Sequence, residues 1–270
     1  MRSILVLADS GPAAEQRLQA ALDIARLTDG HVTLHVNTPL QRFVSMDPFG
    51  GSYVMEGALA EEQAREDRLV EALTAKLSSE NVPWDITTGA GMPANDLIAA
   101  APLADLIVLS LTPPDSPAAA DTTMLVGDVA VSASCPVLAI PAAEKPLFVT
   151  GTAMIAWNGG AEAANALRAA VPLLALAGEV KLVTITNRPE ELPAIDALQY
   201  LSRHGIHAEL VVRPHEHQRI AEALEEAADA VGADWIAMGA YGHSRMREMV
   251  FGGVTHHFLN SAKFPLLLSH

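Results

Sequence analysis

Four glycines follow an apolar run near the end of the chain, in the segment ADWIAMGAYGHSRMREMVFGGVTHHFL, and the spacing of the first three is the feature of interest. Two residues separate Gly239 from Gly242, and nine separate Gly242 from Gly252. Glycine lets the backbone approach a ligand closely and adopt positive φ. The N–H groups at the N-terminus of a following helix can then hold an anion. The spacing therefore favours a phosphate-binding loop after a buried strand, with a tight structural turn as the alternative.

The histidines and the cysteine could bind a metal, but they lack further ligands at the spacing that a metal site needs. His215 and His217 alternate in RPHEHQR, and His256 adjoins His257, but no carboxylate or cysteine stands at a familiar metal-ligand spacing. We expect solvated or core histidines and no metal site. Cys135, the only cysteine, stands in the apolar run CPVLAI and is expected to be a small buried side chain.

Catalytic signatures are also missing from the sequence. The chain contains no G-x-x-x-x-G-K-[ST] loop with its phosphate-binding lysine and no G-x-S-x-G nucleophile elbow. A binding module is therefore favoured over an enzyme.

The elements that would position the glycines belong to a unit that occurs twice. The segment SILVLADSG from Ser3 aligns with TAMIAWNGG from Thr152, an offset of 149 residues. The segment ADLIVLS from Ala104 aligns with ADWIAMG from Ala233, an offset of 129 residues. Each half contains five short apolar runs that alternate with helical patterns. Such alternation predicts βαβ units, and therefore an open parallel sheet with helices on both faces.

The predicted fold class is α/β, with two tandem open five-stranded parallel-sheet domains. We place the boundary near residue 146, in the segment AAEKPLFV, so the domains are residues 1–146 and 147–270. The offsets differ because the first half has a longer excursion, PLQRFVSMDPFGGSYVMEG, which is expected to be a loop leading into a helix. The two halves are expected to pack as an intrachain pseudo-dimer, and a homodimer is left open.

The charge balance excludes some partners. The formal net charge is −15 over 270 residues. A negative field opposes the approach of nucleic acid and of anionic lipid. No apolar stretch approaches the roughly 18 residues that a membrane span needs, and no signal-peptide cleavage pattern follows the start of the chain. We therefore expect a cytoplasmic protein that binds neither nucleic acid nor membrane, although backbone N–H groups could still hold a small anion.

The motifs GxxGHSR and GGVT resemble the universal stress protein family, and the segments ADWIAMGAYG and FGGVT are the most specific parts of the resemblance. In that family, G-x2-G-x9-G-[ST] marks the members that bind ATP. The resemblance covers essentially the whole chain and implies a tandem member with the adenine nucleotide alpha hydrolase-like fold. It also implies that ATP is the ligand, with magnesium left open as its companion ion.

The resemblance assigns site residues by position. It places Asn158 beside the adenine and ribose, and Thr184 or Ile185 beside the adenine through the backbone. It places four glycines around the triphosphate: Gly239, Gly242, Gly252 and Gly253.

Two positions depart from the family pattern. Gly253 stands where the ATP-binding members have Ser or Thr, and Asn158 stands where they have Asp. Losing one hydrogen bond to a charged group would weaken binding by about 1.5–3 kcal/mol. Ser244 or Thr255 could supply the missing hydroxyl. We expect valine at Gly239 or Gly242 to abolish ATP binding while leaving the fold intact.

The expected function is that of a cytoplasmic stress-response regulator or sensor, with one nucleotide per chain in the C-terminal half. The first half ends its fourth strand as LSLTPPDSPAAADTTM, without glycine, and Pro113 and Pro114 lack the N–H groups that phosphates need. Two alternatives stay open: an interaction scaffold whose loop is a relic, and a slow ATPase.

Overall fold

Five strands from each half of the chain build the main sheet. The computed structural model describes residues 1–11, 13–39, 44–46, 52–142, 146–186, 192–214, 219–241 and 253–270. The first half contributes β1 (Ser3–Ala8), β2 (His31–Asn37), β5 (Trp84–Gly89), β6 (Leu106–Leu111) and β7 (Val137–Pro141). The second half contributes β8 (Thr152–Trp157), β9 (Glu179–Thr186), β10 (Ala208–Pro214), β11 (Trp235–Gly239) and β12 (Leu266–Ser269).

These strands form one continuous ten-stranded sheet in the order β10-β9-β8-β11-β12-β7-β6-β1-β2-β5. Neighbouring strands within each half are parallel, whereas β12 and β7 pair antiparallel where the halves meet. The α/β class and the parallel sheet of each half are thus confirmed. The boundary near residue 146 stays a prediction, with β7 ending at Pro141 and β8 beginning at Thr152.

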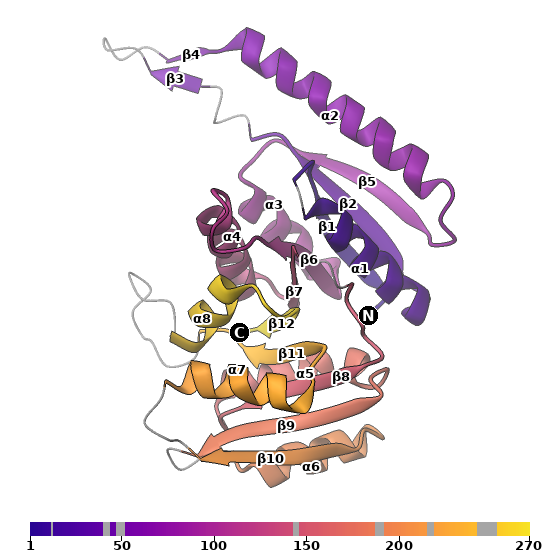
Figure 1. Cartoon of the computed structure of the whole chain (residues 1–270). Helices are drawn as coiled ribbons and strands as arrows, with labels where there is room; N and C mark the ends of the chain where they lie inside the picture. Colours follow the sequence, from indigo (N-terminus) through magenta and orange to yellow (C-terminus); the bar gives the residue numbers. More distant parts are fainter. Residues whose placement is uncertain are drawn as a thin grey trace.

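Helices cover both faces of the sheet (Figure 1). The helices of the first half are α1 (Ala14–Thr28), α2 (Glu56–Leu77), α3 (Pro93–Ala100) and α4 (Ala119–Ser132). Those of the second half are α5 (Ala161–Leu174), α6 (Ala194–Arg203), α7 (Ile220–Val231) and α8 (Gly253–Ser261). One apolar core joins the sheet to α1, α2, α5 and α6, and a second joins its other face to α3, α4, α7 and α8.

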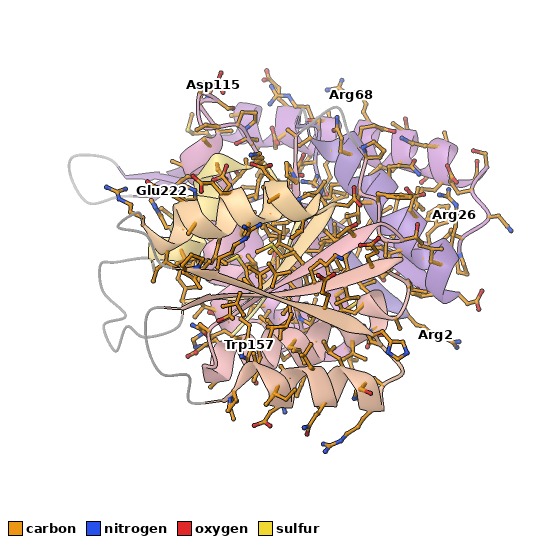
Figure 2. The ribbon with its side chains drawn as sticks, turned by 60° about the horizontal axis from the view of Figure 1, so that its bottom comes forward. Arg2, Arg26, Arg68, Asp115, Trp157 and Glu222 are labelled. Carbon is orange, nitrogen blue, oxygen red and sulfur yellow. The ribbon has the colours of Figure 1, made fainter. Side chains whose placement is uncertain are left out.

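The sequence explains this layering. All six residues of β6, LIVLSL, are buried, as expected for a central parallel strand covered on both faces. Helix α7 buries Ala221, Leu224 and Ala228 at helical spacing and ends at Gly232, whose φ of 65° suits glycine. The charged residues labelled in Figure 2, such as Arg26 and Asp115, lie on the periphery.

The long excursion of the first half differs from the expected plain loop. It contains an antiparallel pair of short strands, β3 (Val44–Met46) and β4 (Ser52–Val54), before α2 begins. Hydrogen bonds between the strands give this segment regular backbone structure that its glycine pair and scattered aromatics did not indicate.

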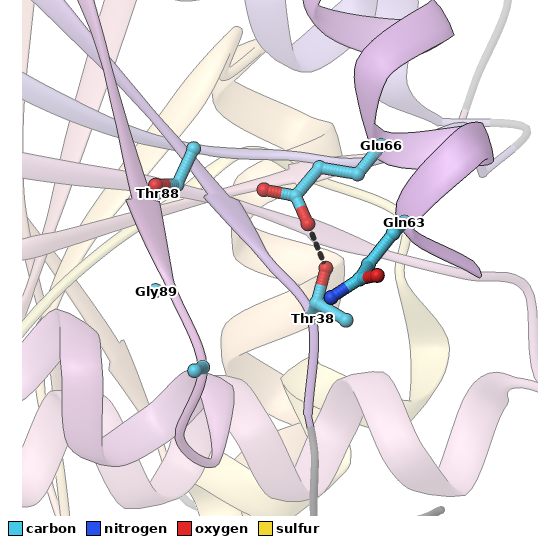
Figure 3. A pocket seen from close by; sticks show the side chains of 6 residues that line it. Thr38, Gln63, Glu66, Thr88 and Gly89 are labelled. Atoms are coloured by element: carbon cyan, nitrogen blue, oxygen red, sulfur yellow. Dashed lines mark hydrogen bonds between the residues drawn. The ribbon is translucent and has the colours of Figure 1, made fainter. Parts of the chain in front are cut away.

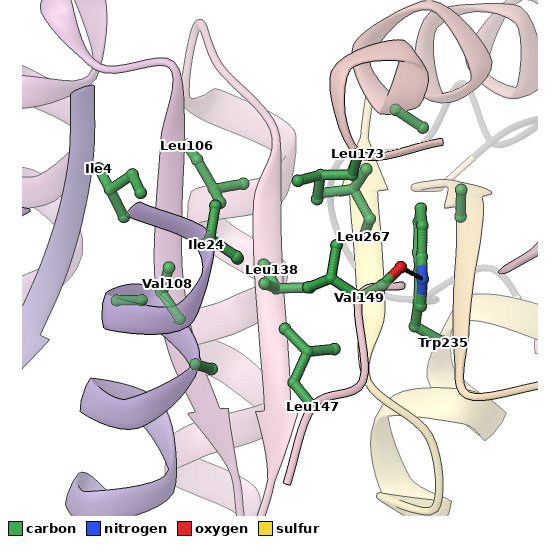
Figure 4. Packing of buried hydrophobic residues seen from close by; sticks show 14 of the residues in the cluster. Ile4, Ile24, Leu106, Val108, Leu138, Leu147, Val149, Leu173, Trp235 and Leu267 are labelled. Atoms are coloured by element: carbon green, nitrogen blue, oxygen red, sulfur yellow. Dashed lines mark hydrogen bonds between the residues drawn. The ribbon is translucent and has the colours of Figure 1, made fainter. Parts of the chain in front are cut away.

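The segment between the halves is part of the core. Leu147 and Val149 are buried, and the Trp235 indole Nε1 donates to the Val149 carbonyl at 3.3 Å. Figure 4 shows both side chains beside Leu138 of β7 and Leu267 of β12. The connection therefore packs over the junction where the two halves share the sheet.

Candidate functional site

Four of the predicted site residues lie at the carboxyl ends of β8, β9 and β11. Strand β11 pairs with β8, and β8 pairs with β9, all in parallel, so their last residues lie along one edge of the sheet. Asn158 follows β8, Thr184 and Ile185 lie near the end of β9, and Gly239 ends β11. Open α/β sheets bind ligands outside this edge.

Asn158 shapes the turn between β8 and α5. Its Oδ1 accepts the backbone N–H of Gly160 at 2.9 Å, and Gly159 has a φ of 73°. Helix α5 begins directly afterwards, so its N-terminus faces this edge of the sheet. In the first half, Asp9 Oδ1 accepts the N–H of Gly11 at 2.8 Å in the same way.

Gly239 lies against the first turn of α5. A Cβ there would lie 2.7 Å from the carbonyl carbon of Glu162 and 2.8 Å from the backbone nitrogen of Ala163. Such contacts cannot be relieved by rotating a side chain, because both atoms belong to the backbone. The expectation that valine at Gly239 leaves the fold intact is therefore wrong: the side chain would displace α5.

Thr255 ties the start of α8 to the end of β11. Its side chain is buried, and its Oγ1 accepts the N–H of Tyr241 at 3.3 Å and donates to the Gly239 carbonyl at 3.5 Å. Tyr241 has a φ of 59°, so the chain turns sharply after the strand. The Thr255 hydroxyl, expected as a spare phosphate ligand, is engaged within the protein.

Gly253 has the opposite surroundings to Gly239. It is the first residue of α8, it is exposed, and a Cβ built on it would meet no atom within 4 Å. A serine or threonine therefore fits at this position without displacing any described residue.

Thr184 and Ile185 present backbone rather than side chains to the edge. Thr184 is 4% exposed and Ile185 is 9% exposed. Thr184 is in register with Trp157, the last residue of β8, so Ile185 extends one residue beyond that strand. Its position suits the expected backbone contact with an adenine.

The contact of Leu192, in the segment after β9, with the turn after β8 is a feature that the sequence pattern did not indicate. The Trp157 indole Nε1 donates to the Leu192 carbonyl at 3.2 Å, and the Leu192 N–H donates to the Gly159 carbonyl at 3.1 Å. Leu192 thus lies over the turn that Asn158 shapes.

The sequence pattern also did not indicate Glu162 as a residue of the site. It lies in the first turn of α5, and its Oε2 is 3.5 Å from where a Cβ on Gly160 would be. Its carboxylate is therefore close to the N-terminus of α5, where its negative charge opposes the binding of an anionic ligand.

Tyr241, which follows β11, lies near the first half of the chain. Burial, and then the nearby carboxylate of Asp128 on α4, raise the pKa of Tyr241 to about 12. The phenol is therefore neutral at physiological pH. The start of the glycine segment lies close to a helix of the first half.

The first half carries an ion pair between a buried arginine and a partly exposed aspartate at the equivalent edge. Arg17 on α1 is 3% exposed, and its Nη2 lies 2.9 Å from Asp9 Oδ2. Its Nη1 donates to Ser110 Oγ at 2.9 Å, and Ser110 Oγ donates to the Ala13 carbonyl at 3.2 Å. Burial lowers the pKa of Arg17, and Asp9 opposes that shift. Asp9 and Ser110 stand where the second half has Asn158 and Gly239, so Arg17 occupies the polar groups of that edge.

Three predicted site residues, Gly242, Ser244 and Gly252, lie outside the described residues, as do His215 and His217. The described residues contain no group of three or more His, Cys, Asp or Glu side chains that could hold a metal ion. Burial raises the pKa of the partly buried Cys135 thiol to about 11, so this thiol is protonated and unreactive. Within the described part of the chain, no helix is long and apolar enough to span a membrane.

Comparison with known proteins identifies the second half most directly. Residues 151–270 match the model of the universal stress protein family. No curated protein matches the chain.

Solved structures match the whole chain. A universal stress protein from Archaeoglobus fulgidus DSM 4304 is 13% identical with a TM-score of 0.76, over 98% of this chain and 97% of that chain. A functionally unknown protein from Pseudomonas aeruginosa PAO1 is 18% identical with a TM-score of 0.63, over 100% of this chain and 92% of that chain. A universal stress protein solved in complex with cAMP matches 46% of this chain and 99% of that chain, at 21% identity and a TM-score of 0.33. We therefore identify residues 151–270 as a domain of the universal stress protein family, within a chain that shares its whole fold with a solved universal stress protein.

Proposed function

We propose that this protein binds ATP in its C-terminal half and acts as a cytoplasmic stress-response regulator or sensor. The observation that carries the proposal is the close approach of Gly239 to the first turn of α5. It brings the end of β11, the N-terminus of α5 and the start of α8 to one edge of the sheet.

This arrangement suits a triphosphate. Helix N-termini carry partial positive charge and N–H groups without partners inside the helix, and both favour bound phosphate. Gly253, at the N-terminus of α8, has open space around it. The resemblance to G-x2-G-x9-G-[ST] supports Gly242 and Gly252 as further phosphate contacts, with Ser244 as a candidate hydroxyl donor.

The other end of the proposed ligand would lie at β8 and β9. Asn158 follows β8, and Ile185 extends one residue beyond it, which leaves room for a backbone contact to an adenine. Asn158 presents an amide, so its nitrogen donates where the carboxylate of the family would only accept. Ribose hydroxyls donate readily to a carboxylate, and we therefore expect the asparagine to weaken the ribose contact.

Calorimetry with ATP and magnesium tests the proposal, together with assay of nucleotide released by acid from the purified protein. We expect Asn158→Asp to tighten ATP binding by about three- to ten-fold, because one charge-assisted hydrogen bond is restored. An aspartate keeps the acceptor for the Gly160 N–H, as Asp9 does in the first half. Asn95→Asp, at an exposed position of α3, is the matched control for the added charge.

A folded protein that neither retains nucleotide nor binds ATP would overturn the proposal and favour the interaction scaffold. Release of phosphate from ATP well above that of a Gly242→Val control would instead indicate the slow ATPase.

A further inference from the structure

The two halves differ at the carboxyl ends of β2 and β5, far from the proposed nucleotide site. His35 and Asn37 follow Gly30 at the same spacing as Val183 and Ile185 follow Gly178. His35 is in register with Thr87 of β5, as Val183 is with Val211 of β10. The second half is apolar at these positions, where it packs against α7, whereas the first half is polar.

The polar side chains of the first half form a partly buried cluster around His35. His35 is 7% exposed, and its Nδ1 lies 3.1 Å from Thr87 Oγ1. Asp96 Oδ2 accepts Asn37 Nδ2 at 2.6 Å and the Gly91 N–H at 3.1 Å. Among the described residues, His35 Nε2 and Asn37 Oδ1 are buried without a hydrogen bond, although His35 Nε2 is 3.7 Å from Asp96 Oδ2. Burying such groups is costly, so their retention at a sheet edge points to function.

A cavity of about 220 Å³ lies next to this cluster, between α2 and the ends of β2 and β5. Figure 3 shows the Glu66 carboxylate and the Gln63 amide of α2 directed toward the strand ends. The cavity is lined by Thr38, Gln63, Glu66, Thr88, Gly89 and Ala90. Gly89 joins cavity and cluster, because a Cβ there would lie 2.7 Å from His35 Nε2 and closer still to Asp96 Oδ2.

The described residues of the second half lack the groups that line this cavity. Val212 stands in the register position of Thr88, as the pairing of Val36 with Thr88 and of Thr184 with Val212 shows. Helix α6 has 10 residues where α2 has 22, and the additional length of α2 carries Gln63 and Glu66 over the strand ends. The longer helix and the polar strand ends therefore occur together in the first half.

The lining groups define the ligand chemistry. Glu66 accepts a hydrogen bond from Thr38 Oγ1, and its second carboxylate oxygen remains available to a ligand. The Thr38 and Thr88 hydroxyls can accept further hydrogen bonds. The formal net charge of −15 also favours cations over anions. The volume is below the roughly 300–1,000 Å³ of pockets for drug-sized ligands, so a nucleoside triphosphate would not fit.

We propose that this cavity binds a small organic cation through a primary ammonium group, which Glu66 neutralises and the Thr38 and Thr88 hydroxyls orient. The cluster of His35, Asn37 and Asp96 lies against Gly89 of the lining, and Asp96 also holds the backbone N–H of Gly91 just beyond it. This site is separate from the proposed ATP site and does not depend on it.

The test uses the full chain and three amine probes, putrescine, agmatine and lysine, with butane-1,4-diol as a neutral isostere of putrescine. In protein-observed NMR titrations, we expect at least one amine to cause saturable shifts around Thr38, Thr88 and Gly89, and the diol to cause none. Glu66→Gln should weaken that binding by about ten-fold or more, the size of one charge-assisted contact. Glu71→Gln, on the exposed surface of the same helix, is the matched control and should leave it unchanged.

Absence of saturable binding by all three amines would overturn the proposal. Equal loss in Glu66→Gln and Glu71→Gln would also overturn it, because it would show attraction to the overall charge only. Thr88→Val, which copies the residue of the second half, keeps the test informative if Glu66→Gln folds poorly. The affinity of Glu66→Gln for ATP should match that of the unmodified chain, which separates this proposal from the proposed function.

Discussion

Gly239 and Gly253 belong to the same glycine pattern but have different roles in the structure. At Gly239 the backbone of α5 lies where a side chain would be, whereas at Gly253 there is open space. In the first half the position of Gly239 is taken by Ser110, whose Oγ donates to the carbonyl of Ala13. The first glycine therefore has a packing role whether or not a nucleotide binds.

We expect Gly239→Ala to lower the free energy of unfolding by about 1–3 kcal/mol, the usual cost of overpacking. Gly253→Ala is the control and should cost nothing measurable, because no atom lies near its Cβ. Chemical denaturation of both variants would measure the difference. Equal stability of the two would show that α5 can move away from β11 without cost.

Gly253→Ser should tighten ATP binding by about ten-fold, because it restores one hydroxyl donor to phosphate. Calorimetry is the measurement. Gly57→Ser is the matched control, since Gly57 of α2 also has no atom within 4 Å of a built Cβ. Unchanged or weaker binding in Gly253→Ser would mean that another hydroxyl, such as that of Ser244, already serves, or that phosphate does not bind there.

We expect Glu162 to make ATP binding at the proposed site depend on magnesium. Its carboxylate lies at the N-terminus of α5, so Glu162→Gln should tighten ATP by about three- to ten-fold when magnesium is absent. The gain should shrink when magnesium shields the phosphates. Glu71→Gln controls for net charge, and an equal gain in that variant would contradict a local effect.

At the scale of elements, an aspartate side chain accepts the backbone N–H groups at the start of the first strand in each half. Asp105 Oδ2 accepts the N–H of Arg2 at 2.6 Å and of Ser3 at 3.0 Å, which fastens β1 to the segment before β6. Asp234 Oδ2 accepts the N–H of Thr152 at 2.7 Å and fastens β8 to the segment before β11. At each site a carboxylate accepts backbone N–H groups at the start of a strand.

The hydrogen bonds to the Asp105 carboxylate predict that the stability of the fold depends on pH. The N–H groups of Arg2 and then of Ser3 lower the pKa of Asp105 in the folded chain. Its contribution is therefore fully present above the unfolded pKa of about 3.9 and is lost as the pH falls through the lowered folded pKa. The difference in unfolding free energy between the unmodified chain and Asp105→Asn should shrink as the pH is lowered from 7 toward 2 or so.

Urea denaturation at a series of pH values measures this dependence, with Asp115→Asn on the exposed surface as the control. A difference that stays constant over the whole range would show that the carboxylate charge does not contribute.

At the scale of the molecule, the halves share one sheet and one connection. Strand β7 pairs with β12, and Leu147 and Val149 are buried beneath the junction. Separate halves would expose this apolar surface and an unpaired strand edge, which favours aggregation. The number of nucleotides per chain is therefore best measured on the whole protein.

We expect calorimetry to give one ATP per full chain. In the first half, Asp9 is engaged by Arg17, Ser110 replaces the glycine that ends the fourth strand, and Pro113 and Pro114 offer no N–H groups to phosphate. Two nucleotides per chain would contradict the assignment of these groups.

Much of the architecture could be predicted from the amino-acid sequence. The repeat at offsets of 149 and 129 residues, with its alternating strands and helices, indicated the parallel sheet and placed Asn158 and Gly239 at strand ends. Periodicity and turn residues suffice for this, because they reflect which side chains leave water and where the chain reverses.

Other features depend on contacts between residues far apart in the chain. Three such features have no local sequence signature: the approach of the α5 backbone to Gly239, the pairing of Arg17 with Asp9 and Ser110, and the cluster around the buried His35. Arg17 and Ser110 are 93 positions apart in the chain, so no pattern within one element contains their contact. Periodicity predicts that a side chain is buried, but the atoms that surround it come from other elements and are set by how those elements pack.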